Sequence, residues 1–175
     1  MSGLRTRMFG RKRVRPVLQT EAAECGLASL AMIANWNGHD VDLNQLRQRF
    51  GVSARGMGLR QLMQTADDMH LLPRPLKLDI NGLHLLHLPA ILHWDLNHFV
   101  VIERVEAGRA FIVDPVGIAR WYAFEEMGRH FSGVALELRP SQDFRAVKAR
   151  QRLRFRALWS GMTGARRTLA QTIIL

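Results

Sequence analysis

The run Gln19-Thr-Glu-Ala-Ala-Glu-Cys-Gly26 opens the first segment of helical periodicity in the chain. Small or apolar side chains recur at helical spacing after Cys25 as far as Ala34, and Asn37-Gly38 supplies a stop signal. We therefore expect a helix from about Cys25 to Trp36. The only cysteine of the chain stands in its first turn, where unpaired amides and the helix dipole stabilise a thiolate, the reactive form of the side chain.

Two more helices are expected before the pattern changes. Asp42, with Gln45 three positions later, forms a capping-box-like start for a helix that ends at Gly51. The third helix begins near Leu59 and reaches Met69. Apolar runs separated by polar or glycine-containing breaks then predict strands at 90–94, 98–102, 110–113, 120–124 and 134–138, with a short helix at 125–130. Helices followed by an antiparallel sheet indicate an α+β fold.

The basic charge of the chain is concentrated at its two ends. Of 25 Lys and Arg residues, 14 lie before residue 16 or after residue 140, whereas the middle holds 11 of them with 14 of the 15 acidic residues. A nucleic-acid enzyme needs its basic surface on the folded part, so we expect no nucleic-acid partner. We divide the chain into a basic arm (1–15), one folded domain (16–140) and a basic linker (141–175).

The linker has the composition of a segment that approaches a membrane. Apolar and aromatic residues alternate with arginines between 152 and 162, which fits an amphipathic helix on a membrane surface, and residues 168–175 turn apolar like the beginning of a membrane span. A flexible linker is the alternative. A lone cysteine and the lack of a signal-peptide pattern favour the cytosolic side. The sequence has no phosphate-binding loop of the Walker type, so an ATP-driven step would need another domain.

Three further residues provide partners for a cysteine nucleophile, which needs an imidazole and a group that orients it. His98 stands at the polar entrance of one predicted strand and Asp114 at the end of the next, so a short hairpin would place them side by side. Gln19 can add a side-chain amide for a developing oxyanion. The alternatives are an inert buried cysteine, a strand-end histidine without a role and a turn-forming aspartate.

Two other polar groups suggest weaker hypotheses. His84, His87 and His93 could indicate a metal site, but no carboxylate or cysteine completes the ligand set, so we expect no metal. Asp67-Asp68 near the end of the third helix is interpreted as a solvated face.

The motifs together resemble the leader-processing cysteine peptidase domain at the N-terminus of bacteriocin-exporting ABC transporters, in particular the colicin V and microcin exporter type. The resemblance covers about residues 16–140. The matching elements are Gln19 to Gly26, Trp94-Asp-Leu-Asn-His-Phe-Val-Val101, Asp114-Pro115, Ser53 to Gly56 and Phe131 to Glu137.

This resemblance implies a papain-like fold and cleavage of a bacteriocin or microcin precursor directly after a Gly-Gly pair that ends its leader. It further implies a peptidase on the cytoplasmic face of the bacterial inner membrane, fused to transmembrane and nucleotide-binding domains. Cys25 would be the nucleophile, His98 the general base and acid, Asp114 the orienting group and Gln19 the oxyanion donor. Proteolysis would need no cofactor, and ATP would act only in the nucleotide-binding domain.

Two functions from other classes remain open at this stage. Some relatives lack the cysteine and only bind cargo, so a leader-binding module that does not cut is the first alternative. A basic adaptor for nucleic acid or membrane, driven by the two arms, is the second.

Overall fold

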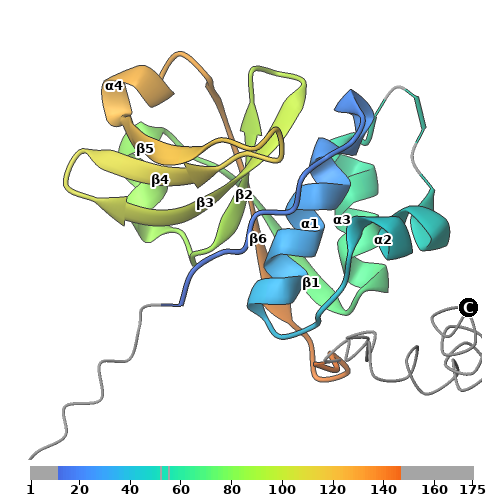
Figure 1. The fold of residues 1–175 in the computed structure, drawn as a ribbon. Coiled ribbons are helices and arrows are strands. Elements are labelled where there is room, and N and C mark those ends of the chain that lie inside the picture. Colours follow the sequence, from blue (N-terminus) through green and yellow to red (C-terminus); the bar gives the residue numbers. More distant parts are fainter. Residues whose placement is uncertain (1–11, 52, 55, 147–175) are drawn as a thin grey trace, which may run out of the picture.

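The computed structural model describes residues 12–51, 53–54 and 56–146. Three helices, α1 (Cys25–Trp36), α2 (Leu43–Phe50) and α3 (Leu59–Asp68), group on one side of a six-stranded sheet (Figure 1). The strands pair antiparallel throughout, in the order β1-β6-β2-β3-β4-β5. They are β1 (Leu71–Lys77), β2 (Ala90–Trp94), β3 (His98–Glu106), β4 (Arg109–Val113), β5 (Ala119–Ala123) and β6 (Phe131–Pro140). Three short helices complete the described part: η1 (Ala22–Glu24), η2 (Ile80–Leu85) and α4 (Phe124–Met127).

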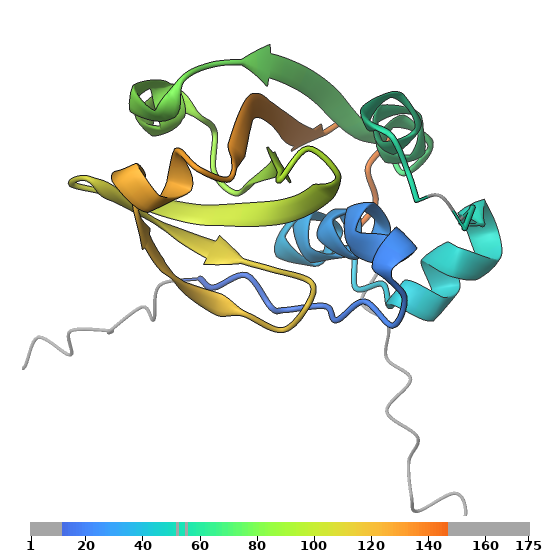
Figure 2. The same cartoon turned by 90° about the horizontal axis from the view of Figure 1, so that it is seen from above.

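Helix α1 is the central element of the helical half. Every residue from Cys25 to Ala34 is buried, because the helix packs on the sheet on one side and on α2 and α3 on the other. The view from above shows this helix between the sheet and the other helices (Figure 2). A helix that is apolar on all sides is typical of such a buried position. Its first turn, which carries Cys25, is therefore held rigidly against its neighbours.

The sequence did not predict strand β1. Its segment contains Pro73 and Pro75, which remove backbone donors and normally argue against a strand. β1 pairs only with β6 at the edge of the sheet, and an edge strand tolerates proline because one side of its backbone needs no partner. The other face of the sheet is covered by a second apolar cluster, which includes Leu83 of η2 and Met127 of α4.

The arm and the linker are only partly described. Residues 1–11 and the predicted interfacial helix beyond residue 146 lie outside the described residues. Val14 belongs to the described part; it is buried, and its backbone N–H donates to Glu103 Oε2 at 3.0 Å. None of the described helices combines the length and the apolar character that a membrane span requires.

The turn between β2 and β3 has an unusual backbone for its sequence. Asp95 and Leu96 have φ angles of 47° and 63°, which asparagine and glycine adopt far more readily. The Leu96 side chain is 78% exposed, so packing does not offset the strain. Leu96→Gly is therefore expected to raise the free energy of unfolding by about 1 kcal/mol. Urea denaturation measures this; Leu96→Ala keeps the Cβ and should show no such gain, and a destabilised glycine variant would contradict the strain.

Candidate active site

Two contacts fix the start of α1 against the start of β3. The Ser29 hydroxyl of α1 donates to the Phe99 carbonyl of β3 at 3.3 Å. Gly26 lies so close to the same strand that a Cβ on it would stand 3.4 Å from the Phe99 ring. Since Phe99 follows His98 directly, these contacts bring Cys25 and His98 to the same place. The start of α1 and the β2–β3 and β4–β5 turns lie where the sheet meets the helical half (Figure 1).

The β3–β4 hairpin joins His98 to Asp114. His98 is the first residue of β3, and Asp114 follows the last residue of β4. The ring Nε2 lies 2.8 Å from Asp114 Oδ1. The same carboxylate oxygen accepts the backbone N–H of Val116 at 3.0 Å, and the Asp114 side chain is largely buried. The carboxylate is therefore held from two sides and can fix the orientation of the imidazole.

The imidazole of His98 lies between a carboxylate and a thiol. Burial of the ring disfavours its charged form, but hydrogen bonds and charge interactions with Asp114 and Cys25 outweigh this and raise the pKa of His98 to about 9. Because Nε2 is bonded to Asp114, Nδ1 is the ring nitrogen that remains for the thiol. Cys25 is itself 5% exposed. At neutral pH the site thus holds an imidazolium that can donate a proton.

Gln19 is tied to the β4–β5 turn. Its backbone N–H donates to the carbonyl of Pro115 at 3.0 Å, which ties it to the turn that begins at Asp114. Its side-chain Oε1 is buried and has no hydrogen-bond partner among the described residues. The two ends of an amide exchange places on rotation about the last side-chain bond, so this unpaired group can present a donor or an acceptor to a ligand. The structure thus places His98 beside Asp114 and Cys25, and it ties Gln19 to the turn that begins at Asp114.

An ion pair next to Cys25 was missed from the sequence. Glu24 is 1% exposed, and its Oε1 accepts a 2.6 Å hydrogen bond from Arg47 Nε of α2. This bond, helped by donors of Thr20 and Glu21 and opposed by burial, lowers the pKa of Glu24 to about 2. An acidic residue just before a helix was visible in the sequence. Its partner was not, because Arg47 stands 23 positions away.

The histidines that suggested a metal site do not gather with other ligands. No group of three or more His, Cys, Asp or Glu side chains suited to a metal ion is found within the part of the chain that the structure describes. His93 Nδ1 instead lies 2.8 Å from the Ser132 hydroxyl.

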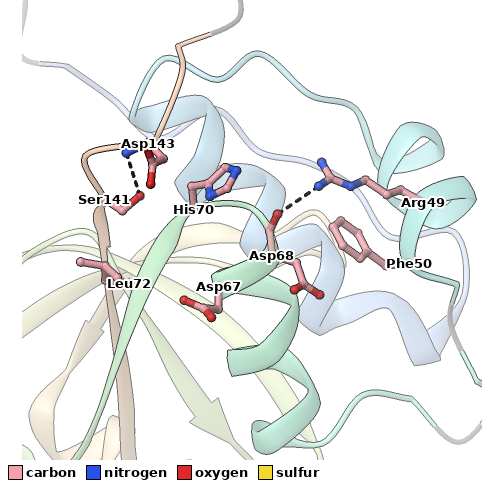
Figure 3. A pocket seen from close by; sticks show the side chains of 8 residues that line it. All are labelled: Arg49, Phe50, Asp67, Asp68, His70, Leu72, Ser141 and Asp143. Atoms are coloured by element: carbon pink, nitrogen blue, oxygen red, sulfur yellow. Dashed lines mark hydrogen bonds between the residues drawn. The ribbon is translucent and has the colours of Figure 1, made fainter.

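A separate pocket contains the two aspartates that were predicted to be solvated. Asp67 and Asp68 are exposed and line it together with Arg49, Phe50, His70, Leu72, Ser141 and Asp143 (Figure 3). Arg49 Nη2 donates to the backbone carbonyl of Asp68 at 3.0 Å. None of the four predicted site residues lines this pocket, so it is distinct from the arrangement around Cys25.

Comparison with known proteins gives the family. The model of the peptidase C39 family matches residues 13–143. The chain belongs to the peptidase C39 family. Membership supports a cysteine peptidase and confirms the resemblance stated from the motifs.

Two curated relatives of this C39 chain come from Escherichia coli. It is 42% identical over 168 residues to the probable microcin-H47 secretion/processing ATP-binding protein MchF, and 42% identical over 164 residues to the colicin V secretion/processing ATP-binding protein CvaB. The matches cover 96% and 94% of this chain but 24% of each relative. The C39 chain therefore spans about a quarter of the length of these relatives.

Solved structures confirm the fold. A double glycine motif protease from an AMS/PCAT transporter, crystallised with the leader peptide, is 33% identical, with a TM-score of 0.69 over 77% of this chain and 96% of that chain. The peptidase domain of Streptococcus ComA is 23% identical, with a TM-score of 0.67 over 74% of this chain and 100% of that chain, and shows the fold alone. The α+β, papain-like fold predicted from the sequence is confirmed.

Proposed function

We propose that this chain is a cysteine endopeptidase that removes the leader of a bacteriocin or microcin precursor after a Gly-Gly pair. We place it on the cytoplasmic face of the bacterial inner membrane, beside the transmembrane and nucleotide-binding domains of an exporter. One observation carries the proposal: the His98 ring is hydrogen-bonded to Asp114 and interacts with Cys25 at the start of α1. The names of the relatives and the leader peptide bound to the solved protease support it.

The geometry supports a thiol-protease mechanism carried out by four side chains. The sulfur of Cys25, as thiolate, attacks the carbonyl carbon of the second glycine, and the oxyanion takes hydrogen bonds from the Cys25 backbone N–H and the Gln19 amide. His98 gives its proton to the leaving amine, which releases the mature peptide and leaves the leader as a thioester. The neutral ring then takes a proton from water while the water oxygen attacks the thioester carbonyl; the carbon–sulfur bond breaks, which releases the leader as a free acid and restores the thiolate beside the protonated ring. Asp114 holds the ring in place throughout.

These steps need no cofactor, because the protein supplies the nucleophile, the acid-base group and the oxyanion donors. ATP would act in the nucleotide-binding domain of the exporter. Selection of Gly-Gly has a simple physical form: a channel too narrow for a Cβ admits only glycine next to the scissile bond. The extended peptide can pair with the backbone near Asn97, and an apolar groove suits an amphipathic leader helix.

Cleavage of a leader-bearing precursor tests the function directly. Purified chain incubated with a precursor that carries a Gly-Gly leader should yield two products that mass spectrometry assigns to cleavage after the second glycine. A precursor with Ala-Ala at these positions should remain intact. Leader binding without any product would instead support the non-catalytic binding module.

Gln19→Ala should lower kcat by roughly 10²-fold and leave KM within about twofold, because an oxyanion donor acts mainly in the transition state. Steady-state cleavage of the precursor measures both constants. Gln48→Ala, a substitution at an exposed position of α2, is the matched control and should cleave normally. A rise in KM at unchanged kcat would assign Gln19 to substrate binding instead.

The pH dependence of cleavage should report His98. The protonated ring is required for proton donation, and its pKa is raised from 6.5 to about 9, so kcat/KM should fall as the pH rises through about 9. Asp114→Asn removes the negative carboxylate that raises the pKa of His98. The fall of kcat/KM at alkaline pH should therefore move to lower pH, and kcat/KM should decrease by roughly tenfold or more. Asp143→Asn, at an exposed carboxylate away from the site, should leave the profile unchanged. If the alkaline fall of kcat/KM occurs at the same pH in Asp114→Asn, the assignment of this fall to His98 and its partner Asp114 is refuted.

A further inference from the structure

The segment from Gln19 to Cys25 is folded around the side chain of Glu24. Glu24 Oε2 accepts three hydrogen bonds: from the Thr20 backbone N–H at 2.9 Å, from the Thr20 hydroxyl at 2.7 Å and from the Glu21 backbone N–H at 3.1 Å. The carboxylate thus closes a small loop whose first residue follows Gln19 and whose last residue precedes Cys25.

Arg47 ties this loop to α2. Its Nε donates to Glu24 Oε1 at 2.6 Å and its Nη2 to the Thr20 hydroxyl at 2.7 Å. Its third nitrogen, Nη1, donates to Asn44 Oδ1 at 2.7 Å, one turn earlier on the same helix. The planar guanidinium fork therefore holds both ends of the loop at once, a geometry that the single point charge of lysine cannot reproduce.

The pair also has an electrostatic consequence for Cys25. A buried carboxylate one residue before the cysteine opposes the negative charge of a thiolate. Arg47 supplies a positive charge that cancels it. Without Arg47 the Glu24 carboxylate would keep only its hydrogen bonds from Thr20 and Glu21 and would lose its positive partner.

We propose that Arg47 is a positioning residue of the peptidase: it holds the Gln19–Cys25 segment in its working shape and cancels the charge of Glu24 beside the nucleophile. This inference rests on the proposed function. It concerns a residue of α2, outside the four side chains assigned to the reaction.

A double-mutant cycle separates the two charges. Arg47→Met should lower kcat for precursor cleavage by roughly 10- to 100-fold, with leader binding within about twofold. Addition of Glu24→Gln to this variant should recover at least about tenfold, because the neutral amide no longer opposes the thiolate. The alkylation rate of Cys25 by iodoacetamide should follow the same order, and the reaction is specific because the chain has one cysteine. Arg49→Met, on the same helix, is the control.

Three results would overturn the proposal: wild-type rates in Arg47→Met, equal rates in the single and double variants, or a loss confined to leader binding. Circular dichroism shows whether each variant is folded. If Arg47→Met does not fold, Arg47→Lys, which keeps the charge without the guanidinium fork, replaces it. Its kcat for precursor cleavage should lie between the wild-type value and the value expected for Arg47→Met. A wild-type kcat in Arg47→Lys would refute the role of the fork. If the wild-type chain does not cleave the precursor, the proposed function fails, whereas the alkylation rates still test the charge effect.

Discussion

Cys25→Ala is expected to abolish leader removal, with kcat lowered by about 10⁶-fold to the background rate. The reason is that the sulfur of Cys25 is the proposed nucleophile, and the chain contains no second cysteine to replace it. Mass spectrometry of the precursor after long incubation gives the residual rate.

Leader binding provides the control for this variant. Truncation of one buried side chain at the site should leave the affinity for the leader within about twofold, so bound but intact precursor is the expected state. Cleavage after the Gly-Gly pair by Cys25→Ala would defeat the proposal that the sulfur is the nucleophile.

His98→Gln is the second large effect, and kcat should fall by roughly 10²- to 10⁴-fold. Glutamine can still bond to Asp114 but cannot exchange a proton with the sulfur or the leaving amine. Alkylation of Cys25 at neutral pH should slow as well, because the thiolate loses its positive partner. Cleavage kinetics and iodoacetamide labelling measure the two effects.

His87→Gln is the matched control for this substitution, since His87 has an exposed side chain away from the site. It should cleave and alkylate at wild-type rates. Equal losses in both histidine variants would show that the effect is general, and unchanged rates in His98→Gln would remove His98 from the mechanism.

The helix that carries the cysteine was predictable because its signals are local. Apolar spacing, the Asn37-Gly38 stop and the position of Cys25 gave bounds of Cys25–Trp36, which the structure confirms. The closeness of His98 and Asp114 was also accessible, since a short β-hairpin leaves few ways to arrange the beginning of one strand and the end of the next.

The features that escaped the sequence depend on distant parts of the chain. The two prolines of β1 argue against a strand, and the strand can be assigned only when its position at the edge of the sheet is known. The hydrogen bond between Glu24 and Arg47 depends on the packing of α2 against α1, and no local sequence pattern predicts that packing. Local sequence signals thus predicted the reactive groups, whereas the hydrogen bonds that hold them in place could be identified only from the folded structure.

The most direct test of the central claim is a crystal structure of this chain with a leader peptide that ends in a Gly-Gly aldehyde. We predict a covalent bond from Cys25 Sγ to the aldehyde carbon, with Nδ1 of His98 within hydrogen-bond distance of the sulfur or the new oxygen and the Gln19 amide directed at that oxygen. An unreacted aldehyde with the sulfur turned away from His98, or an aldehyde bound at another place, would contradict the account.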